Sequence, residues 1–408
     1  MQDSLHRNSV YLLLSSILTA LLGFIFWTIA AHKYSPYEVG IVTSIIAIAA
    51  FIIELSQIGL VNGLIRFMNS FKNKDRLMNT VFAIVSSLAA ATSIIFLITS
   101  PSIYPKANYI SKDIFPSIIF IIYVLGCSYG GIIDGLFVAF RKTQHSLTRN
   151  VTASLVKIIA ILVIGDGLLG LFYSITLSVI VGTLLGLILL IIKCGYQPSL
   201  KLSSEVLKMS RFSIINYVSS CTATLVLALI PLIIIKSMGA SDAAFYYIAF
   251  SVVSLLNFIP KSTTQSFFAE SSKNESSILP NLKRSAKFML LILLPSALFV
   301  FIFGKYILLI FGEQYSQGGL TCLRLLTVTA VLSVINYFGD SILNIQKRLR
   351  MYAFTNIFSA TTTIIFMLPL LRFGLTSVGL GWLLSEIATA AIYIYIFRAQ
   401  LLNWRASS

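Results

Sequence analysis

The sequence predicts an all-α, multi-pass membrane protein in which about twelve helices cross the bilayer in two parallel lobes of six. Of its 408 residues, 57% are hydrophobic and only 11% are charged, whereas soluble domains contain about 25% charged residues. Apolar runs of about 20 residues, the length that spans a bilayer, recur along the whole chain. This composition excludes a water-soluble enzyme, a disordered chain and a disulfide scaffold.

Twelve apolar runs, separated by short polar breaks, define the expected membrane helices in chain order. The runs lack the ten-residue alternation of barrel strands, so each run is interpreted as a helix. The runs cover residues 9–31, 39–63, 79–100, 115–140, 150–164, 168–192, 212–235, 243–267, 287–311, 320–343, 351–370 and 376–397.

An internal repeat divides these helices into two lobes. A shift of 204 residues, half the chain length, places each of the first six runs on one of the last six. Because six is an even number, both lobes enter the membrane from the same side and the repeat is parallel. The expected organisation is an N-terminal lobe over 1–192, a cytoplasmic linker over 193–211 and a C-terminal lobe over 212–408.

The net charge of +16 predicts the orientation of the chain. With the N-terminus in the cytoplasm, 21 basic residues fall in cytoplasmic segments against six in outer loops. Arg141, Lys142 and Arg149 are assigned to one of these cytoplasmic loops. The positive-inside rule therefore places both termini in the cytoplasm, with the protein in the cell (inner) membrane. Topology explains the basic excess, so we expect anionic membrane lipids and no nucleic acid as partners.

The sequence carries no catalytic or metal-binding motif. No loop is long enough to form a soluble catalytic domain, and no G-x-x-x-x-G-K-[ST] nucleotide-binding motif occurs. His6, His32 and His145 are scattered, and the four cysteines lack metal-ligand spacing. We therefore expect no enzyme activity, no cofactor and no metal. Two lobes around a central cleft instead predict transport by alternating access.

Ionisable residues inside the apolar runs are the candidates for function. Each costs about 3 kcal/mol at the bilayer centre, so each should face the cleft, pair with another group or reach the interface. Lys157 lies seven residues from the cytoplasmic end of its run, which allows its long side chain to reach the interface. The intramembrane set is Glu54, Asp134, Lys157, Lys261, Arg324, Asp340 and Glu386.

Small residues recur at four-residue spacing in the apolar runs. Pairs such as Gly126/Gly130 and Gly182/Gly186 form G-x-x-x-G patterns. Such patterns let helix backbones approach closely. We therefore expect tight helix packing at these pairs rather than contact with a substrate.

Short motifs lie at the ends of several expected helices. They are Tyr34-Ser-Pro-Tyr-Glu-Val-Gly40, Ile58-Gly-Leu-Val-Asn-Gly-Leu-Ile-Arg66, Met238-Gly-Ala-Ser-Asp-Ala-Ala-Phe-Tyr-Tyr-Ile-Ala249, Ile259-Pro-Lys261, Leu309-Ile-Phe-Gly-Glu-Gln-Tyr315, Leu323-Arg-Leu-Leu326 and Ile342-Leu-Asn344. Together they resemble the polysaccharide-biosynthesis flippases of the Wzx type over nearly the whole chain. In that family, an acidic residue before glycine starts the second helix and a Gly-Leu…Arg sequence closes it. Ala243 and Ala244 depart from the pattern, because glycine is usual before the eighth helix.

The resemblance implies the MOP (MATE-like) exporter superfamily, with two six-helix lobes and a cleft lined by helices 1, 2, 7 and 8. Its polysaccharide branch moves lipid-linked oligosaccharides, carried on a polyprenyl or dolichyl phosphate, from the inner to the outer leaflet. Glycosyltransferases or a polymerase of the same pathway would then be partners.

A lipid-linked oligosaccharide needs cations for its phosphate and polar groups for its sugars. We expect Arg66 and Lys261 to contact the phosphate, with Arg324 and Lys157 as second choices. The expected substrate-binding set also includes Asn62 and Asn216, and the expected ion-coupling set is Glu54, Asp134 and Glu386. The sequence leaves open whether the coupling ion is H⁺ or Na⁺.

Two other functions compete with the flippase prediction. A cation-coupled drug or metabolite antiporter of the MATE type shares the fold, but the first, seventh and eighth runs contain no acidic residue that would bind a cationic substrate. An integral-membrane glycan ligase or polymerase would need a sizeable outer loop, and the longest one, 101–114, is short.

Overall fold

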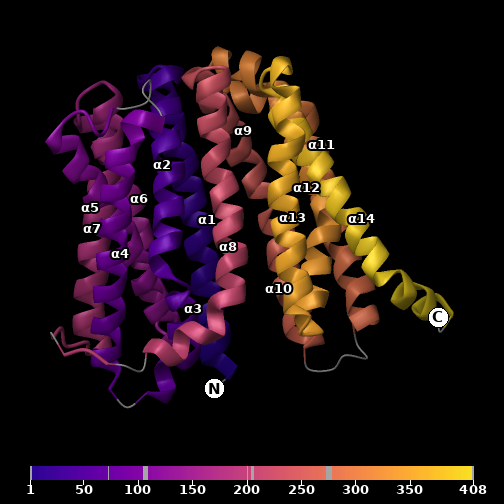
Figure 1. Cartoon of the computed structure of the whole chain (residues 1–408), viewed down its shortest axis with the longest axis horizontal. Coiled ribbons are helices and arrows are strands. Elements are labelled where there is room, and N and C mark those ends of the chain that lie inside the picture. Colours follow the sequence, from indigo (N-terminus) through magenta and orange to yellow (C-terminus); the bar gives the residue numbers. More distant parts are fainter. Residues whose placement is uncertain are drawn as a thin grey trace. The chain divides into compact units, whose positions relative to one another are not determined.

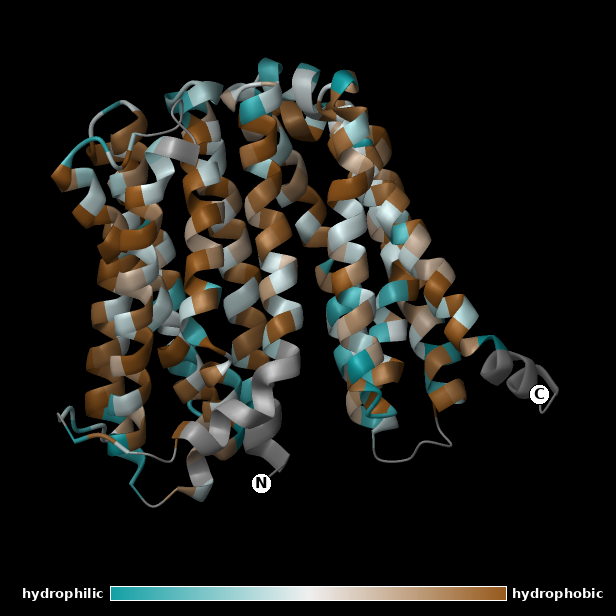
Figure 2. Ribbon diagram, viewed as in Figure 1, coloured by the Kyte–Doolittle hydropathy of each residue, from teal (hydrophilic) through white to brown (hydrophobic). Residues whose placement is uncertain are grey.

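The structure, a computed structural model, describes residues 2–71, 73–103, 109–199, 201–203, 206–272 and 278–406. In these residues the regular structure is entirely helical (Figure 1). Twelve segments are long and apolar enough to cross a membrane, which confirms the predicted number. Hydrophobic residues predominate along the helices in Figure 2.

The chain divides into two compact units, Met1–Thr224 and Leu225–Ser408. The boundary falls inside helix α8, Val206–Ser237. Unit 1 contains α1 (Gln2–Lys33), α2 (Pro36–Gln57), α3 (Leu60–Phe67), the 3-10 helix η1 (Met68–Ser70), α4 (Lys74–Ile103), α5 (Ile114–Ala139), α6 (Gln144–Val163) and α7 (Leu168–Cys194). Unit 2 contains α9 (Ala240–Leu256), α10 (Phe258–Ser271), α11 (Ile278–Leu309), α12 (Glu313–Ile345), α13 (Leu349–Met367), the 3-10 helix η4 (Leu368–Phe373) and α14 (Thr376–Ala406).

The predicted repeat is visible in the helix bounds. The first and last residues of α1 and of α8 differ by 204 positions. The same pairs of equivalent helices also pack together: α5 contacts α4, α7 and α2 in unit 1, and α12 contacts α11, α14 and α9 in unit 2. The apolar spacing that revealed the repeat therefore reflects the same packing scheme in both units.

Two predicted helices are each broken into two. The run 39–63 ends as α2 at Gln57, because Ile58 and Gly59 adopt left-handed φ angles of 44° and 67° before α3 begins. The run 243–267 breaks at Asn257, between α9 and α10. Pro260, which has no N–H to donate to the carbonyl of Leu256, accounts for this second break. Hydropathy alone does not detect either interruption.

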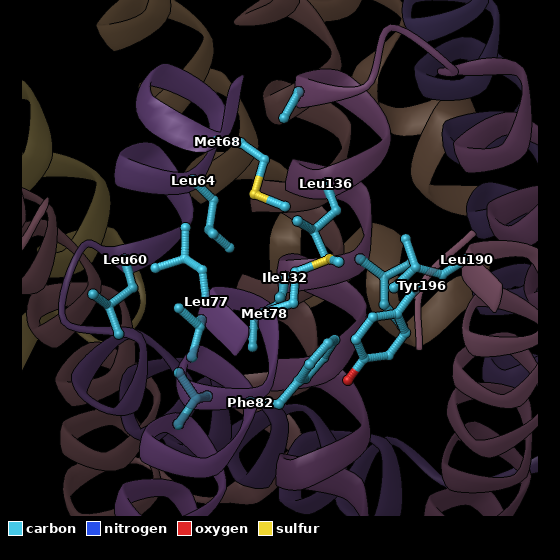
Figure 3. Packing of buried hydrophobic residues seen from close by; sticks show 14 of the residues in the cluster. Leu60, Leu64, Met68, Leu77, Met78, Phe82, Ile132, Leu136, Leu190 and Tyr196 are labelled. Atoms are coloured by element: carbon cyan, nitrogen blue, oxygen red, sulfur yellow. The ribbon is translucent and has the colours of Figure 1, made fainter. Parts of the chain in front are cut away.

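A buried apolar cluster joins α3, α4, α5 and the segment that follows α7 (Figure 3). Leu64, Leu77 and Leu136 are fully buried in it. Tyr196 also packs there, and its hydroxyl donates a hydrogen bond to Oδ1 of Asn79 in α4. Burial raises the pKa of this hydroxyl to about 12, so it remains a donor at physiological pH. The cluster fixes the last turns of α5, where a candidate site residue lies.

Candidate functional site

A buried ion pair joins α5 to α6. The guanidinium of Arg149 donates from Nε to Oδ1 of Asp134 at 3.2 Å and from Nη2 to Oδ2. The Arg149 side chain is only 12% exposed and that of Asp134 is 32% exposed. The assignment of Arg149 to a loop was wrong, because α6 begins at Gln144, six residues before the predicted run. The first turns of α6 are polar in sequence and are helical because they pack against α5 and α7.

Glycines make room for the Arg149 side chain. A Cβ atom at Gly130 of α5 would lie 2.8 Å from Nη1 of Arg149, and one at Gly186 of α7 would lie 2.7 Å from its Cδ. Arg149 also donates to Oδ1 of Asn150 at 2.7 Å. The other members of these two G-x-x-x-G pairs pack against neighbouring helices, since a Cβ atom at Gly126 would lie 2.6 Å from Val179 and one at Gly182 would lie 2.9 Å from Ala153. The predicted close packing is therefore confirmed at both pairs, and at Gly130 and Gly186 it leaves room for the arginine.

A polar seam follows the contact between α1 and α6. Thr143 donates to Oδ1 of Asn8 at 2.9 Å, and Asn150 donates to Ser15 at 3.3 Å. At the other end of α6, Nζ of Lys33 donates to the carbonyls of Ile161 and Ile164 at 2.8 and 3.0 Å. These contacts place the two helices parallel, with polar pairs near both of their ends.

Lys157 lies on this seam, and its ammonium is 4.5 Å from the centroid of the Phe26 ring. Phe26 is fully buried. Because α6 starts at Gln144, Lys157 is thirteen residues from that end, about 20 Å, rather than the predicted seven. No carboxylate of a described residue forms a salt bridge with it. Its positive charge is therefore held inside the helical span by an aromatic face.

In unit 2, Asp340 of α12 is surrounded by neutral donors. Tyr393 of α14 donates to Oδ1 of Asp340 at 2.6 Å, and Asn356 of α13 donates to the same oxygen at 3.0 Å. The Tyr393 hydroxyl also lies 2.8 Å from Oγ1 of Thr355. Gly339 leaves the space that the Tyr393 ring fills, since a Cβ atom there would lie 2.4 Å from its Cδ1.

Glu386 of α14 lies beside Asn336 of α12. The Asn336 amide donates to Oε2 of Glu386 and, at 3.3 Å, to its main-chain carbonyl. Asn336 is 9% exposed, and its Oδ1 has no hydrogen-bond partner among the described residues. Glu386 and Asp340 are close enough to interact electrostatically. We name Asn336, Asp340, Thr355, Asn356, Glu386 and Tyr393 the carboxyl cluster.

The α5–α6 and α12–α13 hairpins have the same turn. Arg141 and Lys347 both adopt left-handed φ angles, 55° and 56°. The next residue in each turn closes a 2.8 Å hydrogen bond, from Lys142 to the carbonyl of Phe137 and from Arg348 to that of Leu343. Turn residues that form the same bonds are therefore 206 positions apart, two more than the helix starts of α1 and α8.

This local shift aligns the two sets of site residues. It places Asp134 on Asp340 and Asn150 on Asn356, whereas Arg149 falls on Thr355 and Gly130 on Asn336. The sequence analysis included Asp340 among the intramembrane candidates without a specific role, and it did not identify Asn336, Asn356 or Tyr393. A local search for the repeat at the basic turns, Arg141-Lys142 and Lys347-Arg348, would have found the aspartate and asparagine matches.

The other predicted residues lie elsewhere in each unit. Asn62 and Arg66 are exposed on α3, and Lys261 is exposed on α10. Arg324 donates from Nε to the carbonyl of Phe301 in α11 at 3.2 Å. Neither Lys261 nor Arg324 forms a salt bridge with a carboxylate of the predicted ion-coupling set among the described residues.

Glu54 is half-buried on α2, in the turn where Tyr217 of α8 reaches the helix. The Tyr217 hydroxyl donates to the carbonyl of Leu55 at 3.0 Å. Glu54 lies close enough to Tyr217 and Cys221 to interact electrostatically with both. The side chain of Asn216, the neighbouring predicted residue, lies outside the described part of the chain.

Solved structures of membrane transporters share this fold. The lipid II flippase MurJ in its inward closed conformation matches with a TM-score of 0.75 at 15% identity, over 95% of this chain and 87% of that one. A multidrug resistance MATE family transporter of the MOP superfamily, in an inward-facing conformation, matches with a TM-score of 0.71 at 17% identity, over 98% and 96%. A MOP superfamily transporter from Pyrococcus furiosus, whose reversed binding-pocket polarity suggests a different function, matches with a TM-score of 0.64 at 16% identity, over 97% of this chain and 95% of that one.

A comparison with curated protein sequences gave no match. The model of a family described as polysaccharide biosynthesis protein matches residues 34–319. This match covers more than half of the chain and includes both broken helices, the Asp134–Arg149 pair and the start of α12. The chain therefore belongs to the polysaccharide biosynthesis protein family, as a multi-pass membrane protein with the fold of the MOP superfamily.

Proposed function

We propose that the protein is a flippase that moves lipid-linked oligosaccharides or polysaccharide repeat units from the cytoplasmic to the outer leaflet by alternating access. The observation that carries this proposal is the polysaccharide biosynthesis family match on a chain with twelve membrane-spanning helices. Such a family needs a step that carries a polar glycan across a bilayer. The lipid II flippase among the solved relatives of the fold is named for a lipid-linked substrate.

The cations of the chain suit the phosphate of such a substrate. Arg66 is exposed in the last turn of α3, and Lys261 is exposed in the first turn of α10, beside the break at Asn257. Both are accessible cations that a phosphate could contact. Lys157 carries a charge within the span without a carboxylate partner among the described residues. Arginine binds phosphate through two parallel hydrogen bonds and lysine binds it as a point charge. Arg324 is the second arginine of this set, and Asn62 and Asn216 would contact sugar hydroxyls.

The orientation and the driving force belong to the same proposal. The protein lies in the cell membrane with both termini on the cytoplasmic side, so the basic loops face anionic headgroups and the incoming substrate. Transport is driven by an ion, and the sequence predicts Glu54, Asp134 and Glu386 as candidates for its binding. Glycosyltransferases or a polymerase of the same pathway supply the substrate and consume the product.

A MATE-type antiporter is the second candidate, because the multidrug transporter matches the chain over 98% of its length. At 17% identity, this likeness concerns the fold alone. A membrane-embedded glycan ligase or polymerase is the third candidate, and it differs from both transporters in making a covalent product.

Translocation in proteoliposomes separates these functions. The full chain is reconstituted with a polyprenyl-diphosphate oligosaccharide, and the fraction that reaches the opposite leaflet is measured by lectin capture. We expect Arg66→Ala and Lys261→Ala each to slow translocation at least about tenfold, the effect of losing about 1.4 kcal/mol of charge-assisted phosphate binding. Arg372→Ala, at an exposed arginine of η4 outside the proposed site, is the matched control.

Each alternative has its own outcome in this assay. Unchanged translocation in both variants would refute the phosphate contacts. Efflux of a cationic dye without lipid movement would favour the antiporter, and a longer glycan formed without a partner enzyme would favour the ligase or polymerase.

A further inference from the structure

We propose that Asp340 and Glu386 of the carboxyl cluster bind and release a proton during the transport cycle, whereas Asp134 of unit 1 is a structural partner of Arg149. This inference rests on the proposed ion-driven function and assigns the coupling ion and its site. It follows from the chemistry of the partners that each carboxyl group has, and from the equivalence of the two hairpins.

Asp134 is paired with Arg149 through both of its carboxylate oxygens. A guanidinium has five N–H donors and no acceptor, and it stays charged in proteins. Its two hydrogen bonds to Asp134 place one N–H group on each carboxylate oxygen, which is the geometry of an arginine–carboxylate ion pair. The Arg149 side chain is 12% exposed in its glycine-lined slot, and among the described residues Asp134 is the only carboxylate that forms a salt bridge with it.

Asp340 can keep its hydrogen bonds in both protonation states. The Tyr393 hydroxyl now donates to Oδ1 of Asp340 and lies 2.8 Å from Thr355. A hydroxyl both donates and accepts. When Asp340 gains a proton, Tyr393 can turn its hydrogen towards Oγ1 of Thr355 and accept the hydrogen of the carboxyl group. Only hydrogen atoms move in this exchange.

Glu386 has an equivalent arrangement with Asn336. The amide presents its NH₂ group to the carboxylate, and its buried Oδ1 is left without a donor. A buried acceptor without a donor is costly. When Glu386 is protonated, the amide can turn over and accept the carboxyl hydrogen at Oδ1. The orphaned oxygen is thus the acceptor that a second protonation state would use.

The charges around the cluster favour a proton. Glu386 interacts electrostatically with Asp340, and no lysine or arginine of the described residues forms a salt bridge with either. The titratable groups that face them are Tyr337 of α12, Tyr352 of α13 and Tyr393 of α14. Two like charges in a low-dielectric site repel, and a single proton removes the repulsion. A metal ion would first have to displace the Tyr393 and Asn356 hydrogens that point at Oδ1 of Asp340.

Infrared difference spectroscopy of the purified full-length protein, without any substrate, tests this proposal. The two buffers are a mildly acidic one at about pH 6, where exposed carboxyl groups are already ionised, and an alkaline one. We expect the carbonyl stretching band of a protonated carboxylic acid at acidic pH and its loss at alkaline pH. Asp340→Asn and Glu386→Gln should each reduce the band, and the double variant should abolish it. Asp134→Asn should leave the band unchanged, because the proposed proton site lies in the carboxyl cluster and Asp134 is paired with Arg149.

Three results would overturn the proposal: a full band in the double variant, loss of the band in Asp134→Asn, or a band that follows added Na⁺ at constant pH. Gel filtration and the melting temperature of each variant identify misfolded samples. If the single variants misfold, Asp340→Glu and Glu386→Asp serve instead, and each must shift the band frequency. The infrared experiment contains no lipid-linked substrate, so its result does not depend on translocation. A titrating band in a protein that fails to translocate the substrate in proteoliposomes would refute the flippase function and still support the proton site.

Discussion

The α5–α6 and α12–α13 hairpins have the same turn, but the aspartate of the first pairs with an arginine and that of the second has neutral partners. Both close with a left-handed basic residue, and both present an aspartate and an asparagine at equivalent positions. In unit 1 an arginine completes the site, and in unit 2 a threonine and a tyrosine do so. The repeat has therefore preserved the packing of the hairpin while two exchanges, Arg149 for Thr355 and Gly130 for Asn336, changed its charge.

One helical framework can therefore hold an ion-paired carboxylate in one unit and a titratable carboxylate in the other. The guanidinium needs the space that Gly130 leaves, so the arginine and the glycine occur together. In unit 2 the side chain of Asn336 stands at the position of that glycine and donates to Glu386 of another helix. Exchanges at these two positions decide whether the aspartate is neutralised by a permanent charge or by a proton.

Breaking the ion pair of unit 1 should have the largest effect on stability. Arg149→Leu leaves the partly buried Asp134 without a counter-charge. Breaking a fully buried pair costs about 3–5 kcal/mol, and because the Asp134 side chain is 32% exposed we expect a loss at the lower end of this range. The free energy of unfolding in mixed detergent micelles measures this change. The double variant Asp134→Leu/Arg149→Leu should recover most of the loss, since an apolar pair replaces two charges. An equal loss in both variants would mean that Arg149 acts through packing alone.

Filling the arginine slot should have the next largest effect. Gly130→Ala puts a Cβ atom 2.8 Å from Nη1 of Arg149, which must shift away from Asp134. Overpacking of this kind costs about 1–3 kcal/mol. Gly23→Ala in α1 is the matched control, because nothing lies within 4 Å of a Cβ there and alanine favours the helix by about 0.5–1 kcal/mol. We expect Gly130→Ala to lower the melting temperature and Gly23→Ala to raise it. A higher melting temperature for Gly130→Ala would contradict the role of Gly130 in making room for Arg149.

Removing the Tyr393 hydroxyl should have the smallest effect, and one that depends on pH. Tyr393→Phe keeps the ring on Gly339 and loses the donor to Asp340. A hydrogen bond to a charged group contributes about 2 kcal/mol and one between neutral groups about 1 kcal/mol. If Asp340 takes up a proton on acidification, the variant loses more stability at alkaline than at acidic pH. Unfolding measured across pH would expose a constant loss, which would mean that Asp340 never changes its charge.

The sequence alone predicted the membrane class, the number of spans and the twofold repeat. These features depend on the length and spacing of apolar runs, which the cost of burying polar groups in a bilayer makes obligatory. It also identified Asp134 and Glu386 as ionisable residues whose cost in the membrane requires a partner or a polar environment. Hydropathy missed the first turns of α6, because their polar residues are helical only through packing and through the pairing of Arg149.

The partners of each carboxylate were decided by the tertiary structure. Tyr393 lies 53 residues from Asp340 in sequence, and Asn336 lies 50 residues from Glu386. Only the packing of α14 against α12 and α13 brings them together. An aspartate in an apolar run has the same local sequence signal whether a cation or a hydroxyl faces it. The physical difference between the fixed and the titratable site therefore lies in the neighbouring helices, which the local pattern does not encode.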